Sequence, residues 1–164
     1  MYMTFKQISP SELERLQKNP SLVKYDPSGL DVDKTWQVMH FLLTGDAWGG
    51  APPLAKTIMG GTDIGEDLGY GPARYLMPEE VREVASALSG VSIDDLRKRF
   101  DPAALEKAEV YPGFSGAVEH VGVDPAAEPE MKDFLEFLLK KFEGLVSYYA
   151  EAASKGNAML LFLI

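Results

Sequence analysis

Two segments with β-type patterns lie at opposite ends of the chain and frame a mostly helical middle. Residues 2–8 are β-rich and partly apolar, which predicts an N-terminal strand. Residues 159–164 are apolar without alternation, which is typical of a strand buried on both faces in the interior of a sheet. We therefore expect the two terminal strands to pair in one small sheet, which the long helix before the C-terminal strand covers.

Helical patterns account for most of the sequence between these strands. In residues 131–154 apolar residues recur at alternating steps of four and three, so they form one stripe along a helix. A second helix, from Asp31 to Leu43, is apolar nearly all round after its first turn, which predicts a central position. In a third, Ser9 and Glu12 predict an N-terminal capping box. Further helices are predicted to begin after similar signals, at Pro78, Ser92 and Asp101.

The stretch from Gly45 to Pro72 is rich in glycine and proline, which predicts a long loop with one short helix over 53–59. Such a loop inside a compact domain is usually functional or mobile. A short strand is expected at 74–76, and residues 111–128 are expected to be irregular, with room for another excursion or a short helix. These patterns predict an α+β fold in a single domain, 1–164: a small mixed sheet that includes the N- and C-terminal strands, packed by a majority of helices.

Composition narrows the classes of function. The chain has no cysteine, which excludes disulfides, thiolate zinc sites, iron–sulfur clusters and cysteine nucleophiles. Its formal net charge is −9, so its surface repels phosphate backbones and anionic lipids, and we expect neither nucleic acid nor membrane as a partner. A basic protein remains a possible partner, although the charge is explained by solubility alone. The sequence has neither a signal-peptide pattern nor an apolar run that could cross a bilayer.

The two histidines are His40 and His120. Asp33, Trp36 and His40 recur at helical spacing, so we expect them on one helix face, where Asp33 could orient the imidazole of His40 as a general base. The alternative is a core histidine bonded to a backbone carbonyl. We expect no metal site and no cofactor, because no metal-binding or nucleotide-binding motif is present.

The segment Gly69–Tyr75 places Arg74 beside Tyr70 and Tyr75, after a turn with two glycines. An arginine framed by aromatic rings can bind a carboxylate or phosphate, which would suit a small anionic ligand. The alternative, which so acidic a chain favours, is that Arg74 pairs with an internal Asp or Glu and locks the loop. Trp48, in another glycine-rich loop, is the best candidate for an exposed aromatic at a pocket or interface, or else it pins that loop to the core.

Three blocks of sequence form a combination that is more specific than any of them alone. They are Leu30–Trp36 leading into His40–Gly45, then Gly69–Leu76, and then Val110–Pro112. On these blocks the chain resembles, over almost its whole length, the bacterial DUF1877 proteins, also called the YfbM-like family. The resemblance implies a cytoplasmic α+β domain. Because no activity is established for the family, the resemblance assigns no catalytic residues to this chain.

These observations favour one candidate region, where the helix with Trp36 and His40 faces the turn before Arg74. The first hypothesis is a binding or interaction domain, because no complete catalytic constellation is present. Its cleft would be lined by Trp36, His40, Tyr70, Arg74 and Tyr75. The alternative is a small hydrolase or transferase acting on an anionic small molecule, with His40 as general base, Asp33 as its orienting group and Arg74 as the anion clamp. The oligomeric state is left open.

Overall fold

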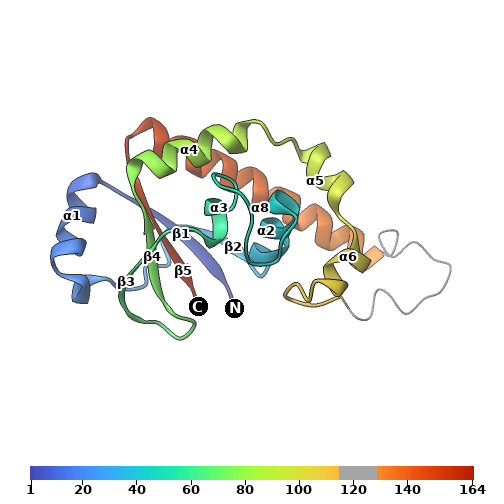
Figure 1. Cartoon of the computed structure of the whole chain (residues 1–164), viewed down its shortest axis with the longest axis horizontal. Helices are drawn as coiled ribbons and strands as arrows, with labels where there is room; N and C mark the ends of the chain where they lie inside the picture. The colour runs from blue at the N-terminus through green and yellow to red at the C-terminus, as the bar shows by residue number, and fades with distance from the viewer. Residues whose placement is uncertain (115–128) are drawn as a thin grey trace.

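A computed structural model describes residues 1–114 and 129–164 and has five strands in one sheet (Figure 1). The strands are β1 (Met3–Ile8), β2 (Leu30–Asp33), β3 (Thr62–Asp67), β4 (Pro72–Leu76) and β5 (Ala158–Leu163). The longer helices are α1 (Pro10–Lys18), α2 (Trp36–Thr44), α4 (Pro78–Ser89) and α8 (Pro129–Ser154). The shorter ones are η1 (Pro20–Leu22), α3 (Lys56–Met59), α5 (Ile93–Arg99) and α6 (Pro102–Lys107).

The C-terminal strand β5 lies at the centre of the sheet, whose order is β2-β1-β5-β4-β3. It pairs with β1 from Met3 opposite Leu163 to Ile8 opposite Ala158, so the predicted pairing of the terminal strands is confirmed. The α+β class is confirmed as well. All four strand pairings are antiparallel, whereas a mixed sheet was predicted. Both ends of the chain therefore lie side by side at one edge of the molecule (Figure 1).

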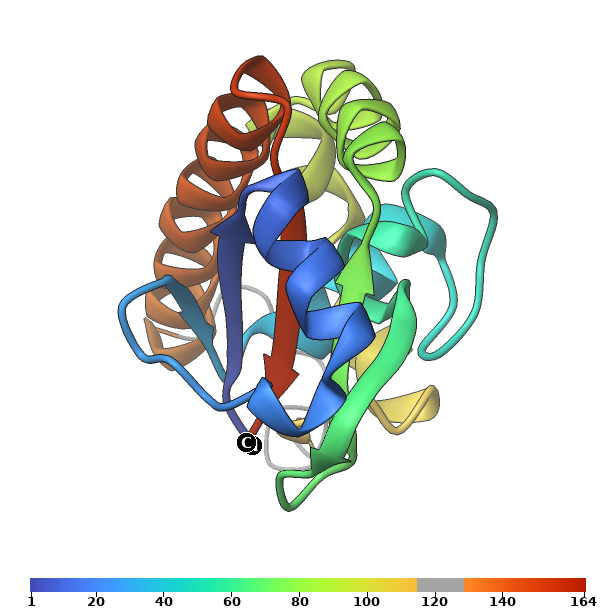
Figure 2. The same cartoon turned by 90° about the vertical axis from the view of Figure 1, so that its left-hand side faces the viewer.

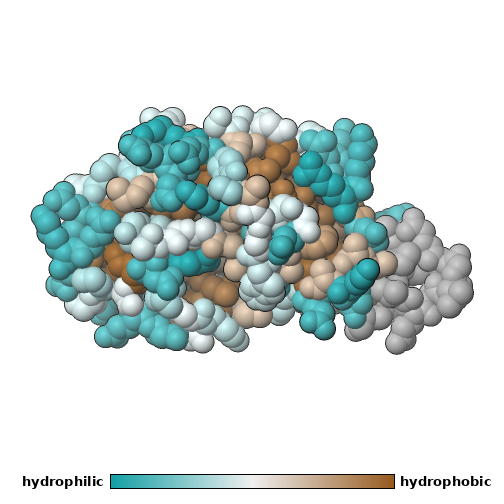
Figure 3. Space-filling model, in the orientation of Figure 1, coloured by the Kyte–Doolittle hydropathy of each residue, from teal (hydrophilic) through white to brown (hydrophobic). Residues whose placement is uncertain are grey.

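The two faces of the sheet are covered unequally. One face carries the main core, formed mostly with α2, α4 and α8, as expected for the long C-terminal helix. The other face carries a smaller cluster below α1 and η1, and Figure 2 shows α1 crossing in front of this face. That cluster consists of Leu16, Val23, Ile64, Ala73, Leu160 and Phe162. In Figure 3, hydrophilic residues cover much of the visible surface, and hydrophobic residues show in patches between them.

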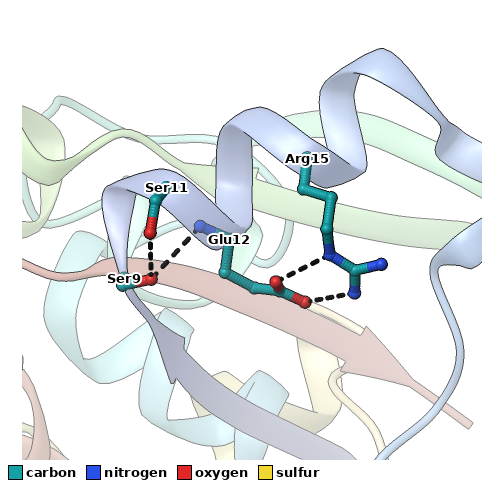
Figure 4. Close-up of polar contacts among 4 residues, drawn as sticks. All are labelled: Ser9, Ser11, Glu12 and Arg15. Carbon is teal, nitrogen blue, oxygen red and sulfur yellow. Dashed lines mark hydrogen bonds and ion pairs between the residues drawn. The ribbon is translucent and has the colours of Figure 1, made fainter.

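The start of α1 differs from the predicted capping box. The Ser9 hydroxyl accepts a hydrogen bond from the Glu12 N–H at 3.1 Å, as expected for an N-cap. The Glu12 carboxylate, however, accepts from Nε and Nη2 of Arg15, at 2.9 and 2.7 Å (Figure 4). Because this two-point ion pair uses both carboxylate oxygens, Glu12 does not turn back to the N-cap backbone.

The predicted helix from Asp31 is wrong in its first turn. Residues 30–33 form strand β2 at the sheet edge, where Leu30 pairs with Phe5, and α2 begins only at Trp36. The Asp31 carboxylate accepts from the Asp33 N–H at 2.6 Å, and Asp33 has a left-handed backbone, with φ of 58°. A turn therefore separates Asp33 from α2, so Asp33 does not share a helix face with His40.

The predicted long loop contains more regular structure than expected. Its short helix is limited to α3, and residues 62–67 form β3, an edge strand that the sequence pattern did not predict. Three of the six residues of β3 are acidic, which hides the strand signal but suits an exposed sheet edge. Of the region expected to be irregular, residues 111–114 contain neither helix nor strand, whereas 115–128 lie outside the described residues. In the described ranges, none of the helices is long and apolar enough to span a membrane.

Candidate functional site

Helix α2 is the scaffold of the candidate site. Seven of its nine residues are buried, and two of these, Gln37 and His40, are polar. The Gln37 side chain donates to the carbonyl of Ala47 at 3.1 Å and accepts from the Tyr111 N–H at 2.9 Å. Thr44, at the end of α2, accepts from the Asp46 N–H at 3.1 Å. The polar side chains of this otherwise apolar helix thus hold two neighbouring loops.

His40 is completely buried, and its Nε2 lies 2.7 Å from the carbonyl oxygen of Gly49. Because a carbonyl only accepts, Nε2 carries the proton, and Nδ1 has no hydrogen-bond partner in the described structure. Burial lowers the pKa of His40, and the positive charge of Arg74 lowers it further, against opposing effects of the Gly49 bond and Asp46. His40 is therefore a neutral imidazole that ties a loop to the core, in agreement with the core-histidine alternative.

The loop that His40 holds presents Trp48 to solvent, with 63% of this residue's surface exposed. The Asp46 carboxylate accepts from the N–H groups of Trp48 and Gly49, at 2.8 and 2.7 Å. These bonds, the one from Gly49 first, lower the pKa of Asp46, so the carboxylate stays charged. The backbone around Trp48 is consequently ordered from both sides, by its own aspartate and by α2.

The buried Trp36 lies under Trp48 and connects this loop to the segment that contains Tyr111. The ring centroids of Trp36 and Trp48 are 6.3 Å apart, and those of Trp36 and Tyr111 are 5.9 Å apart in a stacked arrangement. The Tyr111 hydroxyl also lies 3.2 Å from the N-terminal amine of Met1. We call Asp46, Trp48 and Tyr111 together the Trp48 surface.

Arg74 lies on β4 and is only partly exposed. Its Nη1 donates to the carbonyl of Gly60 at 2.9 Å and its Nη2 to that of Ile58 at 3.0 Å, so Arg74 closes the C-terminal end of α3. Burial lowers the pKa of Arg74, although the guanidinium remains charged. The structure thus has Arg74 locking a loop, as one sequence interpretation expected, but through backbone carbonyls where an acidic side chain was expected.

Tyr149 of α8 completes the buried polar contacts around α3. Its hydroxyl donates to the carbonyl of Thr57 at 2.7 Å, and burial strongly raises the pKa of this hydroxyl. The hydroxyl of Thr57 and the indole N–H of Trp36 are buried without a hydrogen-bond partner among the described residues. This interior region therefore holds several polar groups, and those with partners bond mainly to backbone carbonyls.

The predicted site residues fall into separate places. Trp36 and His40 lie one turn apart on α2, and Arg74 is near enough to influence the charge state of His40. Tyr70 is 58% exposed and lies in the turn between β3 and β4. Figures 1 and 2 show this turn away from α2. Tyr75 follows Arg74 on β4 and therefore faces the other side of the sheet, where it packs against the smaller cluster.

The geometry gives no support to an Asp33–His40 pair. The Asp33 carboxylate accepts from the Lys34 N–H at 2.6 Å, while His40 bonds Gly49. Within the described ranges, His, Asp and Glu side chains form no group of three that could hold a metal ion. His120 lies outside the described residues. Of the predicted cleft residues, Tyr75 lines a surface hollow together with Pro20 and Asp63, on the face of the sheet away from α2.

The sequence interpretation gave no role to Gln37 and Thr44, which hold the Trp48 loop, or to Tyr111, which bonds Gln37 and stacks on Trp36. Two signals were available. Gln37 and Thr44 interrupt an otherwise apolar helix, where a polar side chain needs a partner. Tyr111 lies in one of the sequence blocks that carried the family resemblance, but its stacking on Trp36 joins residues that are far apart in the chain.

Comparison with known proteins places the chain in a family. The family model described as "Domain of unknown function (DUF1877)" matches residues 1–162. Protein YfbM of Escherichia coli (strain K12) is 28% identical over 138 residues, which cover 82% of this chain and 76% of YfbM. A crystal structure of YfbM, titled as a protein of unknown function, has the same fold, with a TM-score of 0.71 and 24% identity over 100% of both chains. The chain therefore belongs to the DUF1877 family.

Proposed function

We propose that this protein is an interaction domain that binds a protein partner through the Trp48 surface. The observation that carries the proposal is the 63% exposure of Trp48 on a loop ordered by Asp46 and His40. Tryptophan is enriched among the residues that dominate binding energy at interfaces. Because the loop is already ordered, little conformational entropy is lost when a partner covers it.

The charge of the chain favours a basic partner. The formal net charge is −9, and the Trp48 surface itself carries the ionised Asp46. Complementary charge steers association and makes it sensitive to salt. The partner class that fits is therefore a basic protein whose surface offers an apolar recess for the indole ring.

We do not extend the proposal to a hydrolase or transferase. His40 is fully buried and bonded to Gly49, and both Nη atoms of Arg74 donate to backbone carbonyls. The bond of His40 holds the Trp48 loop, and those of Arg74 hold the end of α3, which packs against α2. We assign Trp36, His40 and Arg74 positioning roles beneath the surface that a partner would contact.

The test compares Trp48→Ala with Tyr70→Ala, which removes an exposed aromatic from a different loop. Tagged full-length chains are used to capture proteins from a bacterial lysate, and each captured protein is then purified and its affinity measured. We expect a basic protein that binds the Tyr70→Ala variant normally and the Trp48→Ala variant at least tenfold more weakly. Its affinity is expected to fall as salt is raised from about 0.05 to 0.5 M.

Two results would contradict the proposal. If no captured protein depends on Trp48, the surface is not a docking site. If the Trp48-dependent partner is acidic and its affinity is insensitive to salt, the assigned partner class is wrong. Thermal unfolding of both variants serves as the control for folding, because each replaced side chain is largely exposed.

A further inference from the structure

A groove lies on the less covered face of the sheet, on the opposite side of the sheet from α2. Its volume is about 340 Å³, at the lower end of the size range of small-molecule sites. The floor is apolar and comes from β1, α1, η1, the segment after η1, and β5. Its apolar lining residues are Ile8, Leu16, Leu22, Val23, Leu160 and Phe162.

One side of the groove is an aromatic wall. The ring of Tyr25 meets that of Phe162 edge-on, with centroids 5.7 Å apart and an angle of 80°. Tyr25 and Leu22 are 38% and 40% exposed, so two large apolar side chains stand at the rim in contact with water. Exposed apolar groups that border an apolar hollow are typical of ligand sites.

The charged residues at the rim leave one cation without a partner. Asp26 pairs with Lys6 at 3.0 Å, and hydrogen bonds from Ser28 together with Lys6 lower the pKa of Asp26 to about 2. Glu12 is engaged by Arg15. Lys24 forms no ion pair with any described residue, so it is the lining cation whose charge is available to an anionic ligand.

We propose that this groove binds a small amphipathic carboxylate, whose apolar body lies against the exposed side chains of Leu22 and Tyr25 and whose carboxylate pairs with Lys24. A ligand that covers Leu22 and Tyr25 removes apolar surface from water, and the unpaired ammonium group of Lys24 selects the anionic end. The site is independent of the Trp48 surface, because it lies on the opposite side of the sheet and shares no residue with that surface.

The experiment titrates the full-length chain with octanoate and with the neutral 1-octanol, followed by backbone amide NMR shifts. Octanoate is expected to shift residues lining the groove and to bind more tightly than octanol. Lys24→Glu is expected to weaken octanoate binding about three- to tenfold. Lys132→Glu, an exposed position on α8 with the same change of charge, is the matched control and is expected to bind as the parent does.

Three outcomes would overturn the assignment. Octanol could bind as tightly as octanoate, Lys24→Glu could behave like Lys132→Glu, or the shifts could fall outside the groove. A lipid surface would offer the same chemistry, so sedimentation with phosphatidylglycerol vesicles is also measured. No co-sedimentation is expected at a net charge of −9, and co-sedimentation that Lys24→Glu abolishes would assign the groove to a membrane surface.

Discussion

Two loops of this protein expose an aromatic side chain beside an aspartate that binds backbone N–H groups. Asp46 accepts from Trp48 and Gly49, and Asp67 accepts from Gly69 and Gly71 in the turn that carries Tyr70. In sequence the two loops look alike, since both combine glycine, an aspartate and an aromatic residue. Either could have been the functional one.

The difference between the two loops is their support from the core. The Trp48 loop receives hydrogen bonds from Gln37 and His40 of α2, and its indole packs on the buried Trp36. The Tyr70 turn is closed by local bonds, such as that from the Leu68 N–H to the Gly71 carbonyl at 3.0 Å. An exposed aromatic becomes a credible docking group when buried residues fix its position, as they do for Trp48.

The largest effect is expected from Trp36→Ala, which removes the buried ring under Trp48. Loss of a fully buried Trp side chain should lower the free energy of unfolding by about 3–5 kcal/mol. Urea unfolding measures this loss. Tyr70→Ala is the comparison, and it should change the free energy of unfolding little. If both variants lost the same stability, the two loops would be equally coupled to the core and the distinction drawn above would fail.

Arg74→Met tests the support under α3. Removing two hydrogen bonds from a charged donor to the carbonyls of Ile58 and Gly60 should cost about 2–3 kcal/mol of unfolding free energy. Arg82→Met, at an exposed position on α4, is the matched control and should have little effect. Equal losses of unfolding free energy in the two variants would mean that the hydrogen bonds of Arg74 do not stabilise the fold.

The pH dependence of stability tests His40. Because burial lowers the pKa of folded His40 below its usual 6.5, the unfolded chain binds more protons as the pH falls past that value. The contribution of neutral His40 to the free energy of unfolding is therefore complete above about pH 6.5. It is lost as the pH falls towards the pKa of His40 in the folded chain. We expect unfolding free energy to decline between pH 7.5 and 5, and His40→Gln to flatten this slope, with His120 replaced in both chains. An unchanged slope would show that His40 does not titrate differently in the folded state.

The smallest effect is expected from paired Asp46→Asn and Asp67→Asn variants. Each weakens the acceptor of two backbone N–H groups in an exposed loop, so hydrogen exchange should accelerate locally. We expect the Trp48 and Gly49 amides to exchange less rapidly in Asp46→Asn than the Gly69 and Gly71 amides do in Asp67→Asn, because α2 still holds the first loop. The reverse order would remove the contrast between the loops.

Several features were determined by the sequence alone. The helix starts at Ser9, Ser92 and Asp101 were predicted, because an N-cap joins residues two or three positions apart. The interior position of β5 followed from its uninterrupted apolar residues, and membership of the DUF1877 family followed from the combined sequence blocks. In each case the signal lies within a short stretch of chain.

The tertiary structure decided the rest, because the deciding contacts join distant residues. The edge strands β2 and β3 form through pairing with β1 and β4, which overrides a helical pattern in one case and an acidic composition in the other. Arg74 was flagged for its aromatic neighbours, yet its partners are carbonyls 14 and 16 residues away. Likewise, Trp48 differs from Tyr70 through contacts with distant residues, namely the bonds from Gln37 and His40 and the packing on the buried Trp36, since both aromatics lie in glycine-rich loops of similar composition.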